Sequence, residues 1–378
     1  MFSYPHLQSP TLYPLSQPWQ SDKYPLTILS SVQSTTGVVV VGDILPAAEG
    51  STHSLRYLRA SHSLIGGVWL DDKVVTLDGA ASLAVDKSGT PLGDPIYSAF
   101  VLQEAARLVS STPQGKSGDL SGLGAGTSAS ALVQHGISTT IVEIDPAVYD
   151  AARQYFGLPE LAKGHVFLED ARNWAQERRR LAMPDPATEV APVEVDIFDI
   201  IIHDCFSGGS VPEHLYSLQF WEDLKVSLDP EGVVAVNFAG SLASDASKGV
   251  ATTLMKAFGQ CRAFHDSLTL PLTQEQYESE FMNIVFFCSP SARPLEFRLA
   301  RNDDYLNSHL RARILSTLAM REVSMDEIRG SEVWTEEQEQ QYLITDFANK
   351  LGDWQQGGAF DHWKLMREVL PDAVWEAY

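Results

Sequence analysis

Three glycines, and an acid that follows them at a fixed spacing, are the residues in this chain best suited to bind a ligand. Gly122, Gly124 and Gly126 lie in a short turn after an apolar stretch, and Glu143 ends the next apolar stretch, about 20 residues further on. Glycines let a ligand approach the backbone, and a carboxylate at the end of the second strand accepts hydrogen bonds from both ribose hydroxyls. The layout predicts a nucleoside-binding strand–helix–strand unit, although turns of this kind also occur where nothing binds.

The spacing within the turn bears on the class of nucleoside. A dinucleotide fingerprint continues as Gly-x-Gly-x-x-Gly, whereas Ser128 stands two positions after Gly126 here. The pattern therefore favours a cofactor of the S-adenosylmethionine type over NAD.

Two further acids end predicted strands. Asp170, followed by Ala171, comes after the stretch 165–168, and Asp204 follows the buried run 198–203. In open α/β sheets ligands bind beyond the carboxyl ends of the strands. A single acid at such a place is often only a helix cap, but three on successive strands indicate a site.

In order and spacing, these pieces resemble the spermidine synthase-like branch of the Rossmann-fold, S-adenosylmethionine-dependent transferases. The resemblance implies that Glu143 binds ribose, that Asp170 binds adenine and that Asp204 faces the acceptor. It also implies that the glycine turn and Ala171 belong to the cofactor site. The segments that carry it are 122–126, 142–146, 169–171, 199–204 and 228–233, preceded by 77–79 and Tyr97 of a β-hairpin domain.

The chain departs from spermidine synthases at positions that matter for the chemistry. Those enzymes have an Asp inside the glycine turn and a Gln shortly after an Asp-Gly pair, where this chain has Ala125 and Ser82. Their second Asp-Pro after the catalytic Asp is also missing from the run 205–212. A buried cationic donor or diamine needs carboxylate partners, whereas intact S-adenosylmethionine carries a carboxylate that suits an acid-free turn at a helix N-terminus.

We therefore expect methyl transfer to an amine or hydroxyl acceptor. The first alternative is an aminopropyltransferase of the spermidine or spermine synthase type, which uses decarboxylated S-adenosylmethionine and recruits acids such as Asp94, Glu104 or Asp346. The second is a non-catalytic binding protein that retains the fold.

Asp204 is the predicted catalytic residue, since it would accept a proton or a hydrogen bond from the acceptor. Tyr97, Ser207 and Asp346 are predicted to contact a small-molecule or protein acceptor. Ser207 belongs to a loop over 206–212 whose glycines would allow a gate to close over the site.

Composition limits the other classes of function. The net charge of −22 argues against a nucleic acid partner, and no apolar run approaches the roughly 18 residues of a membrane helix. Cys205, Cys261 and Cys288 have no paired spacing, which predicts free thiols, a reducing compartment and a cytoplasmic location. No His/Cys cluster has the spacing of a metal site.

The expected fold class is α/β, with a Rossmann-like, mostly parallel sheet covered by helices on both faces. A small antiparallel β domain precedes it and a helical C-terminal extension follows it. Tryptophans concentrated in that extension are typical of an appendage packed on the main domain, or of an oligomer interface such as that of a homodimer. The expected divisions are a tail or lid at 1–24, a β-rich domain at 25–110, the cofactor-binding catalytic domain at 111–295 and the extension at 296–378.

Overall fold

The computed structural model describes residues 18–20, 25–45, 53–80, 82, 84–110, 117–188, 191–206, 209–330, 334–370 and 372–376. Most of the predicted tail and Ser207 therefore lie outside the described residues.

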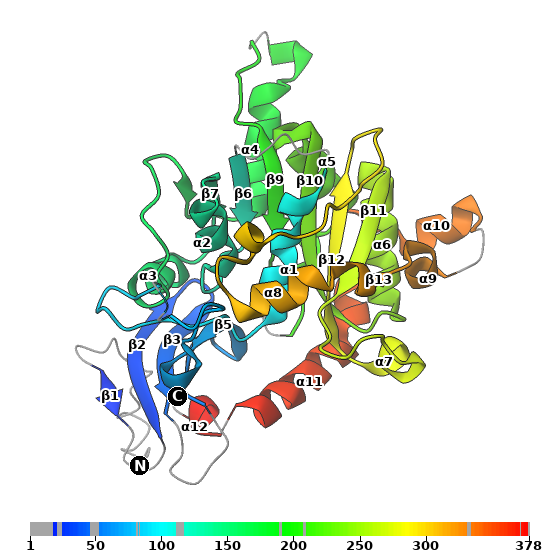
Figure 1. The fold of residues 1–378 in the computed structure, drawn as a ribbon. Coiled ribbons are helices and arrows are strands. Elements are labelled where there is room, and N and C mark those ends of the chain that lie inside the picture. Colours follow the sequence, from blue (N-terminus) through cyan, green and yellow to red (C-terminus); the bar gives the residue numbers. More distant parts are fainter. Residues whose placement is uncertain are drawn as a thin grey trace, which may run out of the picture.

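The N-terminal region forms an antiparallel sheet in which successive strands are neighbours (Figure 1). Runs of β-branched residues such as Val38–Val41 favour strands because they pack well on a pleated surface. The strands are β1 (Trp19–Gln20), β2 (Leu26–Ser34), β3 (Gly37–Ile44), β4 (Leu55–Ala60) and β5 (Ser63–Trp69). After β5 the chain forms a 3-10 turn at Asp71–Lys73 and continues outside this sheet.

The large sheet has the strand order β13-β11-β12-β10-β9-β6-β7-β8. The neighbours from β10 to β8 run parallel, whereas β12 is antiparallel to both β10 and β11. Consequently β11 points the same way as β10, and their carboxyl ends lie at one edge. The strands are β6 (Ser117–Ser121), β7 (Ser138–Val142), β8 (Val166–Phe167), β9 (Phe198–His203), β10 (Leu228–Gly240), β11 (Gln260–His265), β12 (Met282–Ser289) and β13 (Glu322–Val323).

Helices cover both faces of this sheet, as Figure 1 shows. Side chains alternate along each strand, so Ile201 belongs to one buried cluster while Ile200 and Ile202 belong to the other. The first face is covered by α4 (Ala171–Ala182), α5 (Leu218–Leu224), α6 (Asp245–Phe258) and α9 (Met325–Arg329). The second is covered by α1 (Ser98–Gln103), α2 (Thr127–Gln134), α3 (Pro146–Tyr155) and α8 (His309–Ser316). The predicted fold class is confirmed.

The C-terminal region is tied to both sheets. Strand β13 pairs with β11 at the edge of the large sheet, and the segment before it is divided into α8 and a 3-10 turn at Leu318–Met320. Helix α11 (Leu351–Val369) then runs back towards the N-terminal sheet (Figure 1). Met366, Leu370 and Trp375 belong to the buried cluster of that sheet. The remaining helices are α7 (Gln274–Ser279), α10 (Glu336–Tyr342), α11 (Leu351–Val369) and α12 (Asp372–Glu376).

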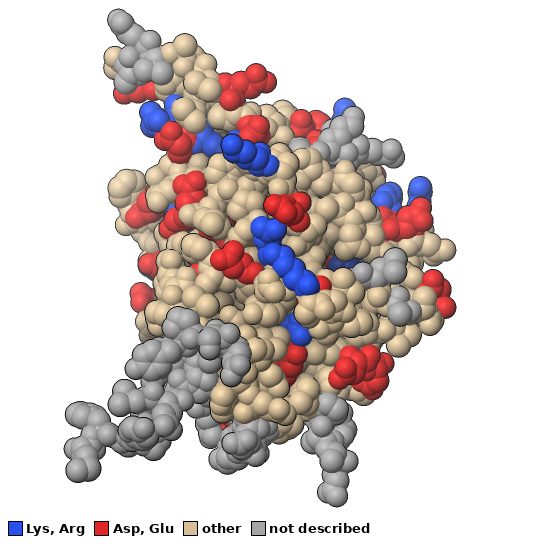
Figure 2. All heavy atoms as spheres, turned by 90° about the vertical axis from the view of Figure 1, so that its left-hand side faces the viewer, with Lys and Arg blue, Asp and Glu red and all other residues tan. Residues whose placement is uncertain are grey.

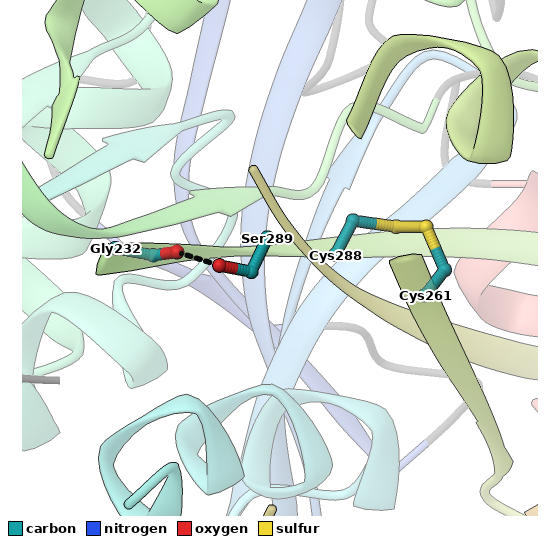
Figure 3. Close-up of a disulfide and its surroundings, with 4 residues drawn as sticks. All are labelled: Gly232, Cys261, Cys288 and Ser289. Atoms are coloured by element: carbon teal, nitrogen blue, oxygen red, sulfur yellow. Dashed lines mark hydrogen bonds between the residues drawn. A yellow bond between two sulfur atoms is a disulfide. The ribbon is translucent and has the colours of Figure 1, made fainter. Parts of the chain in front are cut away.

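The expectation that every cysteine is a free thiol is wrong for two of them. Cys261 of β11 and Cys288 of β12 form a disulfide (Figure 3). The strands are antiparallel and their register places these residues directly opposite each other. Beside the disulfide, the Ser289 hydroxyl donates to the carbonyl of Gly232 at 2.7 Å (Figure 3). The pairing is invisible in the sequence, because the two cysteines have a sequence separation of 27 and α7 lies between them.

Candidate functional site

One cavity of about 410 Å³ lies at the carboxyl-terminal edge of the large sheet. This volume is within the range of small-molecule and cofactor sites. The predicted residues that line it are Tyr97, Gly122, Gly124, Glu143, Asp170, Ala171 and Asp204. The structure therefore brings together residues that lie more than 100 positions apart in the sequence.

The glycine turn is required by the protein's own packing. Gly122 has a φ of +83°, and a Cβ there would stand 2.0 Å from the carbonyl oxygen of Asp204. At Gly124, with a φ of +52°, a Cβ would stand 2.5 Å from the carbonyl oxygen of Ile65. These glycines let the turn lie directly against β9 and β5, which brings the cofactor half of the cavity next to Asp204.

Glu143 fixes the turn to the end of β7. One of its carboxylate oxygens accepts the backbone N–H of Leu123 at 2.8 Å, and the other accepts that of Asp145 at 2.8 Å. Burial raises the pKa of Glu143, and these two N–H donors only partly oppose that effect. Each oxygen keeps a second lone pair, so the carboxylate can still receive hydroxyl donors from a ribose.

Asp170 caps helix α4 and also lines the cavity. Its Oδ1 accepts the backbone N–H of Arg172 at 2.7 Å, while Oδ2 lies 3.5 Å from Nε2 of His214. Capping engages one oxygen only. The other can face a ligand, and Ala171 follows at the first position of the helix.

Asp204 lies at the bottom of the cavity, just beyond β9. Its Oδ2 accepts from Nε2 of Gln103 at 2.7 Å, and its Oδ1 accepts from Nδ2 of Asn237 at 2.9 Å. Burial raises the pKa of Asp204, and the two amide donors only partly offset this. The carboxylate is thus held by two donors, made more basic by its surroundings and left partly open to the cavity, as a proton acceptor requires.

A second carboxylate, Asp266, also lines the cavity and was not predicted. It follows β11 as Asp204 follows β9, so the strand directions bring both acids to one edge. Sequence analysis missed it because β11 is not part of the parallel run that carries the recognisable motifs. The sequence of β11 includes Gln260, Arg262 and His265, so it lacks the apolar run that marks β9.

The N-terminal sheet and α11 close the cavity. Thr36, in the turn between β2 and β3, lines it and donates its N–H to Asp145 at 2.9 Å. His362 and Met366 of α11 line it from another side, and Met366 accepts a hydrogen bond from the Tyr97 hydroxyl at 3.4 Å. Burial raises the pKa of Tyr97 and lowers that of His362 to about 4, so His362 is neutral near pH 7.

Two predicted site residues lie elsewhere. Gly126 precedes α2 with a φ of +76°, where a Cβ would press on Leu158 and Ala152, and it does not line the cavity. Asp346 forms an ion pair with Arg172 at 2.6 Å and accepts from Ser217, and it is absent from the cavity lining. Asp346 therefore ties the C-terminal region to α4 and α5.

The charged side chains that line the cavity are mainly acidic. Among the described residues that line it none is lysine or arginine, and its two histidines are His214 and His362. Its carboxylates are Glu143, Glu169, Asp170, Asp204, Asp266 and Glu280. Such a lining favours a cationic ligand.

Other classes of site have little support. The described residues contain no group of three or more His, Cys, Asp or Glu placed to hold a metal ion. None of the helices in the described part of the chain combines the length and the apolar character that a membrane crossing requires. On the face shown in Figure 2, basic side chains are scattered among acidic ones and form no continuous basic surface on the described atoms.

The strand order and the site at its carboxyl-terminal edge define a Rossmann-like transferase fold. Residues 106–265 match the family model for the spermine/spermidine synthase domain. The predicted resemblance to the spermidine synthase-like branch of the Rossmann-fold transferases is confirmed.

Individual relatives fall into two groups. The chain is 33% identical over 359 residues to an N-terminal histidine N-methyltransferase of Emericella nidulans. That match covers 93% of this chain but 58% of the relative, so the chain spans less than two thirds of the relative's length. A polyamine aminopropyltransferase of Vibrio vulnificus is 31% identical over 118 residues, 31% of this chain and 35% of its own.

Among solved structures, a probable spermidine synthase of Corynebacterium glutamicum is similar, with a TM-score of 0.49 and 15% identity. The likeness covers 84% of this chain and 93% of that one.

Proposed function

We propose that this chain is an S-adenosylmethionine-dependent N-methyltransferase whose acceptor is the N-terminal histidine of a polypeptide. One observation carries the proposal. A single cavity joins the nucleoside-type edge formed by Glu143 and Asp170 to an acceptor half formed by Asp204 and Asp266. The acceptor class follows the name of the Emericella nidulans relative and agrees with a lining rich in carboxylates.

The residues present fit the cofactor. Glu143 keeps lone pairs for ribose, Asp170 keeps one oxygen that helix capping does not use, and the turn 122–126 carries no acid. Ala125 is buried in an apolar cluster with Val148 and Leu58, so that position could not hold a charged side chain without loss of packing. The bound cofactor supplies a methyl group activated by its sulfonium.

The protein's part in the reaction is orientation and proton transfer. Holding donor and nucleophile in line contributes about 7 kcal/mol or more in favourable cases. Asp204, fixed by Gln103 and Asn237, accepts a hydrogen bond or a proton from the reacting nitrogen. The cavity walls from β4, β5 and α11 exclude water from that contact.

Aminopropyl transfer is the second candidate, favoured by the match to a polyamine aminopropyltransferase and by the acidic lining. Calorimetric titration separates the two. The proposal expects S-adenosylmethionine to bind more tightly than its decarboxylated form, because the turn offers no acid to the free aminopropyl amine. Preference for the decarboxylated form would contradict methyl transfer, and binding of neither would favour a non-catalytic protein.

A cytoplasmic location is also a proposal, and the Cys261–Cys288 disulfide weighs against it, because disulfides are rare in the cytosol. Trapping free thiols at the moment of cell lysis tests it. Labelling of both cysteines would support the cytoplasm, and a protected pair would point to an oxidising compartment.

A further inference from the structure

The second carboxylate of the acceptor half has no role in the reaction described above. Asp266 accepts the backbone N–H of Asn283 at 3.0 Å on one oxygen. Its other oxygen accepts from Nδ2 of Asn283 at 2.9 Å and from the Ser98 hydroxyl at 3.2 Å. A carboxylate has about four acceptor positions, so at least one is left for a ligand in the cavity that Asp266 lines.

Two amides connect Asp266 to Asp204. Nδ2 of Asn237 donates to Asp204 at 2.9 Å and to the side-chain oxygen of Asn283 at 3.3 Å, and Asn283 donates to Asp266. Amide donors are thus turned towards both carboxylates and away from the ligand. Burial raises the pKa of Asp266, and the hydrogen bonds from Asn283 and Ser98, together with the charge of Arg321 outside the cavity lining, only partly offset this effect.

The polar atoms that this network leaves open are acceptors. Oδ1 of Asn237 is buried and has no hydrogen-bond partner, and Asn237 is 6% exposed and lines the cavity. Leaving a buried acceptor unpaired is unfavourable, so a ligand that brings a donor is favoured here. An ammonium group offers several donors and no acceptor, so it suits these open acceptors.

We propose that Asp266 binds the α-ammonium group of the acceptor's N-terminal residue, while Asp204 faces the reacting nitrogen. Asp266 is then a specificity-determining residue that makes a free N-terminus a condition for methylation. An internal histidine or a blocked terminus has no charge to place against it. This inference rests on the proposed N-methyltransferase function.

The test compares short peptides that differ only at the terminus. One begins with a free histidine, one has the same histidine N-acetylated, and one has a residue added before it. Since hydrogen bonds between charged groups are the strong ones, the wild-type protein should prefer the free terminus by about 10- to 100-fold in kcat/KM, mainly through KM. Equal efficiency for free and acetylated peptides would overturn the role of Asp266 and leave methyl transfer standing.

Asp266→Asn supplies the second arm, since it keeps the size of the side chain and removes its charge. The variant should process the free peptide only as well as the acetylated one, with unchanged affinity for S-adenosylmethionine, which also reports that it is folded. The control is Glu160→Gln, which removes an exposed carboxylate outside the cavity lining and should keep the wild-type preference.

A folded Asp266→Asn variant that keeps the full preference would contradict the inference. If that variant does not fold, the peptide series on the wild-type protein still tests whether a free N-terminus is required. No methylation of any of the three peptides by a wild-type protein that binds the cofactor would overturn both the inference and the proposed acceptor.

Discussion

Replacement of Glu143 by glutamine gives the sharpest prediction for the cofactor half of the site. In the wild-type protein its two oxygens accept the backbone N–H groups of Leu123 and Asp145, both at 2.8 Å, from a side chain that is 6% exposed. Glutamine has one oxygen, so its NH₂ group must face one of these N–H donors. The turn then loses one of its two anchors.

The magnitude follows from these contacts. One buried backbone N–H left without an acceptor costs about 1–3 kcal/mol of folding free energy. Loss of a charged acceptor for a ribose hydroxyl weakens cofactor binding by about 2 kcal/mol, which corresponds to roughly 30-fold in the dissociation constant.

Calorimetry with S-adenosylmethionine measures the binding term, and urea denaturation measures the stability term. Glu160→Gln is a suitable control, because Glu160 is 80% exposed and lies outside the cavity lining. A folded Glu143→Gln variant with wild-type cofactor affinity would refute the assignment of Glu143 to the ribose.

The other predictions concern three carboxylates, those of Asp204, Asp170 and Asp86. Asp204→Asn should lower the methylation rate by about 10²–10⁴-fold with near-normal cofactor affinity, measured by product formation and calorimetry, and a wild-type rate would make Asp204 structural. Because burial raises the pKa of Asp204, its protonation should add an acid limb to the activity profile, above the ordinary carboxyl pKa of about 3.9 and beside the limb at about 6.5 that the acceptor imidazole gives. The Asn variant should retain only the imidazole limb. Asp170→Ala should weaken adenosine-type ligands by about 1–2 kcal/mol and inosine-type ligands less, so that equal losses would count against contact with the adenine amino group. Burial alone would raise the pKa of Asp86, but hydrogen bonds from Ser88, Arg56 and Thr90 lower it to about 2. Its contribution to folding is therefore present above about pH 4 and lost as pH falls towards 2, and acid titration of Asp86→Asn against the wild type should show a smaller loss.

The parallel half of the sheet could be predicted because each of its strands ends in a motif of fixed spacing. Glu143, Asp170 and Asp204 follow β7, β8 and β9, and the parallel direction of these strands brings them to one edge. Patterns within short stretches of sequence were therefore sufficient to predict this part of the site.

The antiparallel half could not be predicted in the same way. Asp266, Asn283 and the Cys261–Cys288 pair depend on the register between β11 and β12, which no local pattern specifies. The short strand β13 could not be predicted either, because it exists only through its pairing with β11.

Gly126 and Asp346 show a different limit. Gly126 has the left-handed backbone that its place in the turn suggests, but its hydrogen atom faces Leu158 and Ala152 instead of the cavity. Asp346 is predicted to contact the acceptor, but it forms an ion pair with Arg172 of α4. In both cases the residue type suggested a role in the site, but tertiary packing decides whether the residue faces the cavity.

Mass spectrometry of a peptide with a free N-terminal histidine, after incubation with S-adenosylmethionine and either the wild-type protein or Asp204→Asn, tests the central claim most directly. We predict one added methyl group on the terminal histidine with the wild-type protein and about 10²–10⁴-fold slower formation with the variant. An unmodified peptide with S-adenosylmethionine, together with aminopropyl transfer to an amine from the decarboxylated cofactor, would contradict the account.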